Sequence, residues 1–226
     1  MSQEIKLPSV QIVRTKITEI PKEEVRFATM AAYLWGARIS EVISKASTSD
    51  TTKARGPVGS DMREDIYRYE LYRQDLGRTV WVEEPVAVFG LKTAKRQGLL
   101  RNVAIPLNYE PWGTLLQNYF SDKGSRDVFP FTRQHIWKHA KAVFDDLEYP
   151  IERYKIYRDG QVVKEVDQHS RSFALHALRH LRATELVEYY GFDGFDLSIY
   201  LGWTLSTGGQ VSSVMGRYLA LGWQKY

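Results

Sequence analysis

The sequence predicts an α+β fold, a mainly helical domain with a small antiparallel β-sheet. Three observations lead to this prediction. In several stretches apolar residues recur at three- and four-residue steps, which is the period of a helix with one buried face. β-branched and aromatic residues dominate segments 66–72 and 79–89, as they do in strands. No repeat or low-complexity linker divides the 226 residues, and that length fits one domain with a sizeable core.

The composition limits the classes of protein. An apolar fraction of 43% and a charged fraction of 26% are globular values, which excludes a disordered tail, a collagen-like repeat and a coiled coil. The net charge of +4 permits a polyanionic partner without requiring one. The absence of cysteine excludes disulfides, thiolate metal sites and a cysteine nucleophile. Since no apolar run approaches the roughly 18 residues that span a bilayer and no secretory signal is present, we expect a cytoplasmic protein.

The first elements follow from local signals. Apolar and polar residues alternate weakly near the start, so residues 1–20 are expected to be an N-terminal arm or linker, extended or forming a short strand. A helix is expected from Pro21, a residue that suits a first helical turn, and Gly36 is expected to end it. Ser40 is expected to cap a second helix that runs through Ile43 and beyond.

A sheet is expected in the middle of the chain. Residues 47–62 form a polar loop rich in Ser, Thr, Gly and Asp. Segments 66–72 and 79–89 then predict two strands, and residues 101–107 predict a third, with 91–100 as the hairpin loop that precedes it.

Helical signals return in the second half, over 111–120, 133–147 and most of 172–218. Between them, alternating residues flank Asp159-Gly160, a dipeptide favoured in two-residue hairpin turns. This second hairpin has two interpretations: a solvated surface element, or an extra contact to DNA or to another subunit.

Two basic patches are candidates for phosphate binding. Arg38 lies at the junction of two predicted helices, where a guanidinium and free backbone donors suit an anion. When Arg38 is considered alone, a salt bridge to Glu41 is the better explanation of that arginine. The predicted hairpin loop and its flanks carry four basic residues and no acid: Lys92, Lys95, Arg96 and Arg101. Such a loop can reach a DNA groove or a phosphate, and a solvated hairpin end is the alternative.

Two later patches add chemistry. His176 and Arg179 are three residues apart, so both lie on one face of the predicted helix and could each bind a phosphate oxygen. His180 is interpreted as a structural side chain. Trp203 and Tyr218 lie further along the chain, and only the residues around Tyr218 make it a candidate functional residue.

A histidine pair raises the question of a metal. His135 and His139 have the four-residue spacing of helical metal ligands, but no glutamate lies between them to act as a base. We therefore predict no metal site. The same helix is expected to turn a basic face, with Lys138 and Lys141, toward the DNA backbone.

Four of these patches, taken in order, resemble the boxes of the tyrosine recombinase (phage integrase) family. The similar stretches are GARISEV, LKTAK with RNVAIPL, LHALRHLRATEL, and LGWT followed by VMGRYL. The resemblance runs from about Pro21 to Leu219. It implies that residues 21–226 form a catalytic domain of the tyrosine recombinase type and that the family's N-terminal core-binding domain is absent. The chain is then either the catalytic part of a longer protein or a reduced version.

The resemblance assigns catalytic roles to six residues: Arg38, Lys92, His176, Arg179, Trp203 and Tyr218. The two arginines and the tryptophan indole would stabilise charge on the phosphate without a metal. The histidine would position or deprotonate the attacking group, and the lysine would protonate the departing 5′ oxygen, with Lys95 as a competitor for that role. The tyrosine would attack phosphorus and form a 3′-phosphotyrosyl link, with Tyr200 and Tyr226 as alternatives. No cofactor is expected, since this ester stores the energy for rejoining.

The implied function is a site-specific DNA recombinase or integrase. The resemblance implies double-stranded DNA as the partner, a homotetramer on DNA and a monomer or weak oligomer when free. It also implies a nucleoid-associated protein of prokaryotic, viral or plasmid origin. Lys95, Arg96, Arg101, Lys138 and Lys141 would contact the DNA. The alternatives are a type IB topoisomerase, which would work as a monomer, and a DNA-binding module that does not cut.

Overall fold

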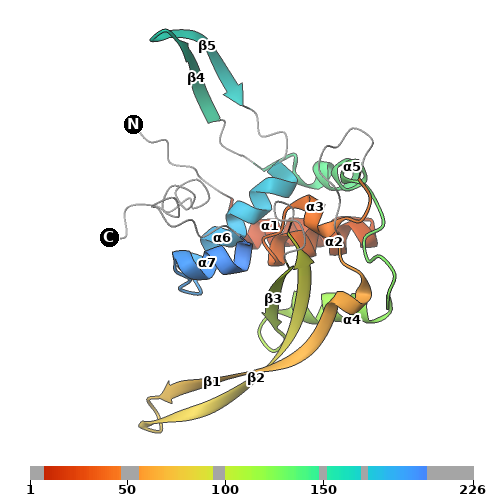
Figure 1. Cartoon of the computed structure of the whole chain (residues 1–226), viewed down its shortest axis with the longest axis vertical. Coiled ribbons are helices and arrows are strands. Elements are labelled where there is room, and N and C mark those ends of the chain that lie inside the picture. The colour runs from red at the N-terminus through yellow and green to blue at the C-terminus, as the bar shows by residue number, and fades with distance from the viewer. Residues whose placement is uncertain (1–7, 47–55, 94–99, 148–151, 169–172, 203–226) are drawn as a thin grey trace.

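The computed structural model of the protein describes residues 8–46, 56–93, 100–147, 152–168 and 173–202 (Figure 1). The helical elements are α1 (Val10–Thr18), α2 (Glu23–Leu34), α3 (Ile39–Val42), the 3₁₀ turn η1 (Gly59–Asp61), α4 (Pro111–Ser121), α5 (Arg133–Phe144), the π-helical turn η2 (Phe173–Ala177), α6 (Leu178–Glu188) and α7 (Gly194–Leu201). The strands are β1 (Met62–Arg73), β2 (Arg78–Lys92), β3 (Leu100–Pro106), β4 (Glu152–Arg158) and β5 (Gln161–Gln168). The predicted mixture of helices with a small antiparallel sheet is confirmed. Across the described ranges, every helix is too short or too polar to cross a membrane.

The start of the chain differs from the prediction. Residues 10–18, expected to be extended or a short strand, form helix α1. The Ser9 hydroxyl accepts a hydrogen bond from the backbone N–H of Ile12 and so caps the helix. Val13 and Ile17, one helical turn apart, are both buried against the core. The cap and this buried pair outweigh the weak alternation on which the extended prediction depended.

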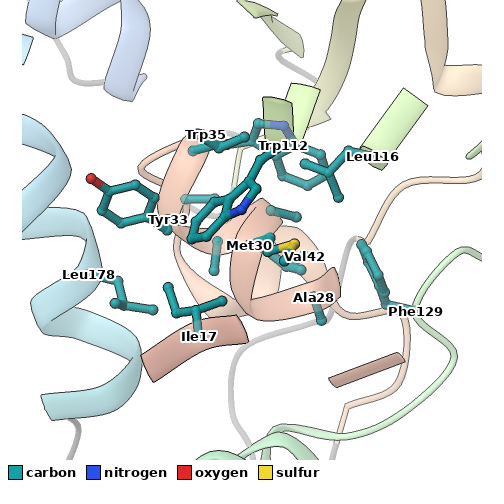
Figure 2. Packing of buried hydrophobic residues seen from close by; sticks show 14 of the residues in the cluster. Ile17, Ala28, Met30, Tyr33, Trp35, Val42, Trp112, Leu116, Phe129 and Leu178 are labelled. Atoms are coloured by element: carbon teal, nitrogen blue, oxygen red, sulfur yellow. The ribbon is translucent and has the colours of Figure 1, made fainter. Parts of the chain in front are cut away.

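Helix α2 is the centre of the core. Figure 2 shows side chains from this helix packed among Trp112, Leu116 and Phe129, which come from α4 and the segment after it. The helix ends at Leu34 with Trp35 as its C-cap, and Gly36 adopts a positive φ of 53°, so the predicted stop is confirmed. The predicted cap at Ser40 is wrong, because α3 is a short helix whose N-cap is Arg38.

The three-stranded sheet has the order β1-β2-β3, and both pairings are antiparallel. All three predicted strands are confirmed, although β1 and β2 are longer than expected. Leu91 and Lys92, expected in the hairpin loop, continue β2 and pair with Arg101 and Leu100. Burial on β2 is concentrated in its inner part, at Glu84 and from Val86 to Leu91, and the outer part of the β1–β2 ribbon extends away from the helices (Figure 1).

The second hairpin, β4–β5, has the predicted turn. Asp159 and Gly160 both have positive φ, 51° and 78°, as a two-residue turn of this kind requires. Helices α4 and α5 correspond to the predicted helices over 111–120 and 133–147. The described part of the last predicted helical region contains η2, α6 and α7.

Candidate active site

The carboxyl ends of α2 and α7 lie against each other. A Cβ atom added to Gly36 would overlap the side chain of Leu201, the last residue of α7. The final carbonyls of a helix have no partner within the helix and form the negative end of its dipole. Two buried arginines, Arg101 and Arg179, donate hydrogen bonds to carbonyls at this junction.

Arg179 joins three distant parts of the chain. Its Nη1 donates to the carbonyl of Gly36, and its Nη2 donates to the carbonyl of Leu201 at 2.8 Å. Helix α6 holds it there through Leu178 and Leu181, which are buried in the core. The guanidinium is wholly buried. This arginine therefore fixes the segment that contains Arg38, two residues after Gly36, beside the helix that follows His176.

Arg101 is buried, which contradicts the prediction that it contacts DNA. Both of its Nη atoms lie 3.1 Å from the carbonyl oxygen of Trp35, and Nη1 also donates to the carbonyl of Tyr200. Its Nη2 lies 3.3 Å from Oε2 of Glu41. Burial lowers the pKa of Arg101, and the Glu41 carboxylate opposes that effect. A run of basic residues in the sequence does not reveal which side chain points inward, and the alternation of β3 turns this one into the core.

Arg38 keeps part of its guanidinium in solvent. It is the N-cap of α3, and its side chain is 21% exposed. Its Nη1 lies 3.1 Å from Oε1 of Glu41, which confirms the salt bridge offered as an alternative to anion binding. The two interpretations are compatible, because a guanidinium has five N–H groups and one carboxylate does not occupy all of them. Glu41 is fully buried and orients both Arg38 and Arg101.

His176 lies among positive charges. Desolvation lowers the pKa of His176, and the charges of Arg179, Arg38 and Arg133 lower it further. Part of the residue remains in solvent, so desolvation is incomplete and the three arginines reinforce it. The imidazole is therefore neutral at pH 7 and can accept a proton. His176, Arg179 and Arg38, which the sequence predicted as one site, come together.

Arg133 belongs to this group although nothing in the sequence patterns singled it out. This residue is the first of α5, and its side chain is exposed. Helix α5 packs against η2, which contains His176, and the Ser44 N–H donates to the carbonyl of Phe129 at 3.0 Å, which ties the chain before α5 to the chain after α3. Only tertiary packing brings Arg133 near His176. The one signal in the sequence was a basic residue after Thr132, a residue type favoured as an N-cap.

Lys92 lies at the end of β2 with an exposed side chain, and its Nζ is 4.0 Å from Oδ2 of Asp61. The next residue, Thr93, is buried near the end of α7: a Cβ on Gly202 would lie 3.3 Å from its Cγ2. The end of β2 therefore lies beside the point where the chain continues into Trp203. Other predicted residues lie outside the described ranges: Lys95, Arg96, Trp203, Tyr218 and Tyr226.

Tyr200, an alternative nucleophile, is partly buried and packs against the core. Its hydroxyl donates to the carbonyl of Leu34 and accepts a hydrogen bond from Nη2 of Arg182 at 3.5 Å. A hydroxyl held between these groups is not presented to a substrate, so this alternative is contradicted. On α5 the predicted basic face is confirmed, because Lys138 and Lys141 are exposed while the opposite side of the helix packs on the core.

The two histidines of α5 lie close together, with ring centroids 4.8 Å apart. Nε2 of His135 is 3.8 Å from Oε1 of Glu24. In the part of the chain that the structure describes, no group of three His, Cys, Asp or Glu side chains could hold a metal ion.

Comparisons with family models, with curated proteins and with solved structures find no match. The chemistry open to this site therefore follows from its own residues. The partly exposed guanidinium of Arg38, which buried Glu41 holds, lies near the neutral imidazole of His176 and the wholly buried guanidinium of Arg179, and together they form a positive region. Such a region suits an anion with several oxygens, such as a carboxylate or a phosphate.

Proposed function

We propose that the protein cleaves and rejoins DNA strands as a site-specific recombinase or integrase of the tyrosine recombinase type, through a 3′-phosphotyrosyl intermediate on Tyr218. One observation supports this proposal most: the hydrogen bond from Arg179 to the Gly36 carbonyl, which holds Arg38 and the His176 helix together. Arg38, His176 and Arg179 come from two of the boxes that resemble the family, and this contact unites them at one site.

Each group has a task in the reaction. The Tyr218 oxygen attacks phosphorus while the bond from phosphorus to the 5′ oxygen breaks. His176, neutral at pH 7, accepts the tyrosine proton, and Lys92 supplies a proton to the departing 5′ oxygen. Arg38, held by Glu41, meets the charge that grows on the non-bridging oxygens without having to reorient. Trp203 adds an indole N–H to the same oxygens.

Arg179 has a different position in this scheme from Arg38. Its wholly buried guanidinium donates to the carbonyls of Gly36 and Leu201 and so holds the ends of α2 and α7 together, next to the segment that contains Arg38. A charge in that low-dielectric interior still adds positive potential at the phosphate. Arg179 therefore supports the reaction through the shape and the charge of the site, with Arg38 making the closer contact.

The DNA partner is double-stranded, and a homotetramer assembles on it. Lys138 and Lys141 on the exposed face of α5, with Lys95 and Arg96, hold the phosphate backbone. Each such contact releases a counterion, so affinity for DNA should fall steeply as salt rises.

A DNA-binding module that does not cut is the second candidate function. One observation favours it: the Arg179 guanidinium is wholly buried and donates to the carbonyls of Gly36 and Leu201, so it is not open to a phosphate. The covalent-trapping experiment described next distinguishes this non-cutting module from the recombinase.

The test is covalent trapping. Wild-type protein, Tyr218→Phe and the control Tyr189→Phe, which changes an exposed tyrosine at the end of α6, are mixed with supercoiled plasmid at low salt and quenched with detergent. We expect protein linked to nicked DNA with wild type and the control, none with Tyr218→Phe, and equal DNA binding by fluorescence anisotropy. An adduct with Tyr218→Phe would show that the nucleophile is another residue. Binding with no adduct in any of the three would favour the non-cutting module.

A further inference from the structure

Two arginines join the same two helix ends. Arg101, from β3, donates hydrogen bonds to the carbonyl of Trp35 at the end of α2 and to that of Tyr200 at the end of α7. Arg179, from α6, does the same one residue further along both segments. Each guanidinium therefore bridges the two ends, and the two bridges lie side by side. The sequence patterns singled out Arg179 for the site, but Arg101 has the equivalent position.

Arg101 also reaches the carboxylate that holds Arg38. Oε2 of Glu41 accepts a hydrogen bond from the backbone N–H of Arg38 at 3.1 Å, and Nη2 of Arg101 lies 3.3 Å from the same oxygen. The other oxygen of Glu41 lies 3.1 Å from Nη1 of Arg38. Because Glu41 is wholly buried, water does not screen these contacts. One carboxylate therefore fixes the positions of Arg101 and Arg38 relative to each other.

Through its backbone, Arg101 belongs to the strand pair that ends in Lys92. Arg101 pairs with Leu91, the residue before Lys92, across the β2–β3 ladder. Leu91 and Thr93 are both buried, whereas Lys92 between them is exposed. A Cβ atom on Gly202 would lie 2.9 Å from Cδ of Arg101 and 3.3 Å from Cγ2 of Thr93, so both strands meet the end of α7 here. A shift of β3 relative to the helices would therefore move the backbone of Lys92.

The burial of Arg101 is costly. Its guanidinium loses its hydration, which lowers its pKa, and its buried Nε has no hydrogen-bond partner among the described residues. Apolar side chains often replace a buried ion pair with no loss of stability. A planar guanidinium can do what an apolar side chain cannot, because it holds two helix ends and a carboxylate in one fixed geometry.

We propose that Arg101 is a positioning residue that holds Lys92 in place relative to Arg38, so that both act on one phosphate. This inference rests on the proposed function for the role of Lys92. Arg101 acts through β2 and Glu41 and does not itself contact the DNA. Without its guanidinium, Arg38 keeps its pairing with Glu41 while the end of β2 can shift. The loss of rate therefore falls on proton donation by Lys92.

A sulfur atom in place of the 5′ bridging oxygen separates proton donation from the rest of the reaction. A thiol has a pKa near about 8.5, so the thiolate leaves without a proton from a general acid. A misplacement of about 1 Å can cost about a hundredfold in rate, and we expect a loss of that size for Arg101→Lys on the oxygen substrate. On the sulfur substrate the same variant should form adduct within about threefold of the wild-type rate, as should Lys92→Ala.

Arg182→Lys is the matched control. Arg182 is also buried and contacts α7 through the Tyr200 hydroxyl, but its carboxylate partner is Glu185 instead of Glu41. A change that only weakens the fold slows both substrates by the same factor, and we expect that of Arg182→Lys. Equal losses for Arg101→Lys on the two substrates, or no loss on either, would overturn the positioning role. A wild type that forms no adduct on either substrate would contradict the proposed function instead.

Amide hydrogen exchange, followed by NMR without DNA, tests Arg101 whatever the protein does to DNA. Arg101→Lys should speed exchange at least about tenfold at the Arg38 amide, whose acceptor is Glu41, and at the amides of residues 91–93. Amides in the middle of α2 should keep their wild-type rates, and Arg182→Lys should not affect the Arg38 amide selectively. Unchanged exchange at both segments of Arg101→Lys, or an equal increase at every amide, would overturn the proposal.

Discussion

The helical body and the β1–β2 ribbon use the same side-chain pairs in opposite surroundings. In the body, Nη1 of Arg182 lies 2.5 Å from Oε2 of Glu185, and the two side chains are 6% and 7% exposed. In the ribbon, Nε of Arg68 lies 2.8 Å from Oε1 of Glu83, and the side chains are 67% and 57% exposed. The geometry is similar, but water screens the second pair and not the first.

This difference in burial decides in which of the two regions charged side chains can form a reactive site. In the body, buried Glu41 holds Arg38 and Arg101, so these charges are fixed before any ligand arrives. Fixed charges stabilise a transition state well, because no energy is needed to reorient them. In the ribbon the charges and aromatic rings face solvent, so water screens the charges and no buried group fixes them.

The largest contrast is expected in DNA cleavage. Arg38→Ala should reduce the rate of adduct formation by about a hundredfold or more, since it removes a fixed donor to the transition state. The matched change Arg73→Ala in the ribbon removes an exposed guanidinium that pairs only locally, with Asp75 at 2.8 Å, and should leave the rate unchanged. Timed covalent trapping measures both rates. Equal rates of adduct formation in the two variants would show that Arg38 is not part of the active site.

The next contrast concerns stability. Glu185→Ala leaves Arg182 as a buried charge without its carboxylate and removes the acceptor of the Tyr33 hydroxyl, so it should lower the free energy of unfolding by about 3 kcal/mol or more. Glu83→Ala breaks the exposed pair and should cost less than about 1 kcal/mol. Urea titration followed by circular dichroism compares them. Similar losses in the free energy of unfolding would mean that burial does not make the ion pair in the body more important for stability than the one in the ribbon.

Two glycines with similar φ angles, one in the body and one in the ribbon, provide a further comparison of the two regions. Gly36 and Gly77 have φ values of 53° and 59°, so alanine is strained at both by about 1–2 kcal/mol. At Gly77, in the ribbon turn, an added Cβ meets nothing within 4 Å. At Gly36 it overlaps Leu201, so Gly36→Ala should cost clearly more than Gly77→Ala in the same urea titration. Equal costs would mean that α2 and α7 do not meet as described.

The smallest effect is electrostatic. Arg133→Ala removes one of the charges that lower the pKa of His176, so that pKa should rise toward its ordinary value, while Arg68→Ala in the ribbon should not change it. NMR titration of the imidazole signals measures both. If the pKa of His176 does not change in Arg133→Ala, Arg133 is not part of the site.

The same shift has a consequence for stability. Because the pKa of His176 is lower in the folded state, the unfolded chain binds more protons just below the ordinary histidine pKa of about 6.5. Stability should therefore fall as the pH drops through that window, and this group should have no effect above it. Arg133→Ala should reduce the loss of stability at low pH that comes from protonation of His176.

Much of the fold could be predicted, because local rules act on short segments. The turn at Asp159-Gly160 and the end of α2 at Gly36 need only the backbone freedom of those residues. Helix α1 was missed because its nine residues bury only two side chains, and so weak a pattern is easily taken for alternation. The length of the β1–β2 ribbon was also missed, since its exposed outer part shows little contrast between its faces.

The site was predicted in part. The positions of Arg38, His176 and Arg179 followed from the four boxes in order, and these three residues do come together. Arg101 was assigned to DNA because it ends a basic run, but the direction of its side chain depends on the register of β3. The place of Arg133 after Thr132 was too weak a signal to identify it, because its nearness to His176 depends on how α5 packs against η2.

The most direct test of the central claim is to map the DNA-linked residue. The covalent complex formed by wild-type protein is digested with nuclease and trypsin, and mass spectrometry identifies the peptide that carries a nucleotide. Trypsin releases Tyr218 in peptide 218–225, whereas Tyr200 lies in peptide 183–217. We predict the nucleotide on Tyr218 within 218–225. A nucleotide on 183–217, or DNA cut with no peptide modified, would contradict the proposed chemistry.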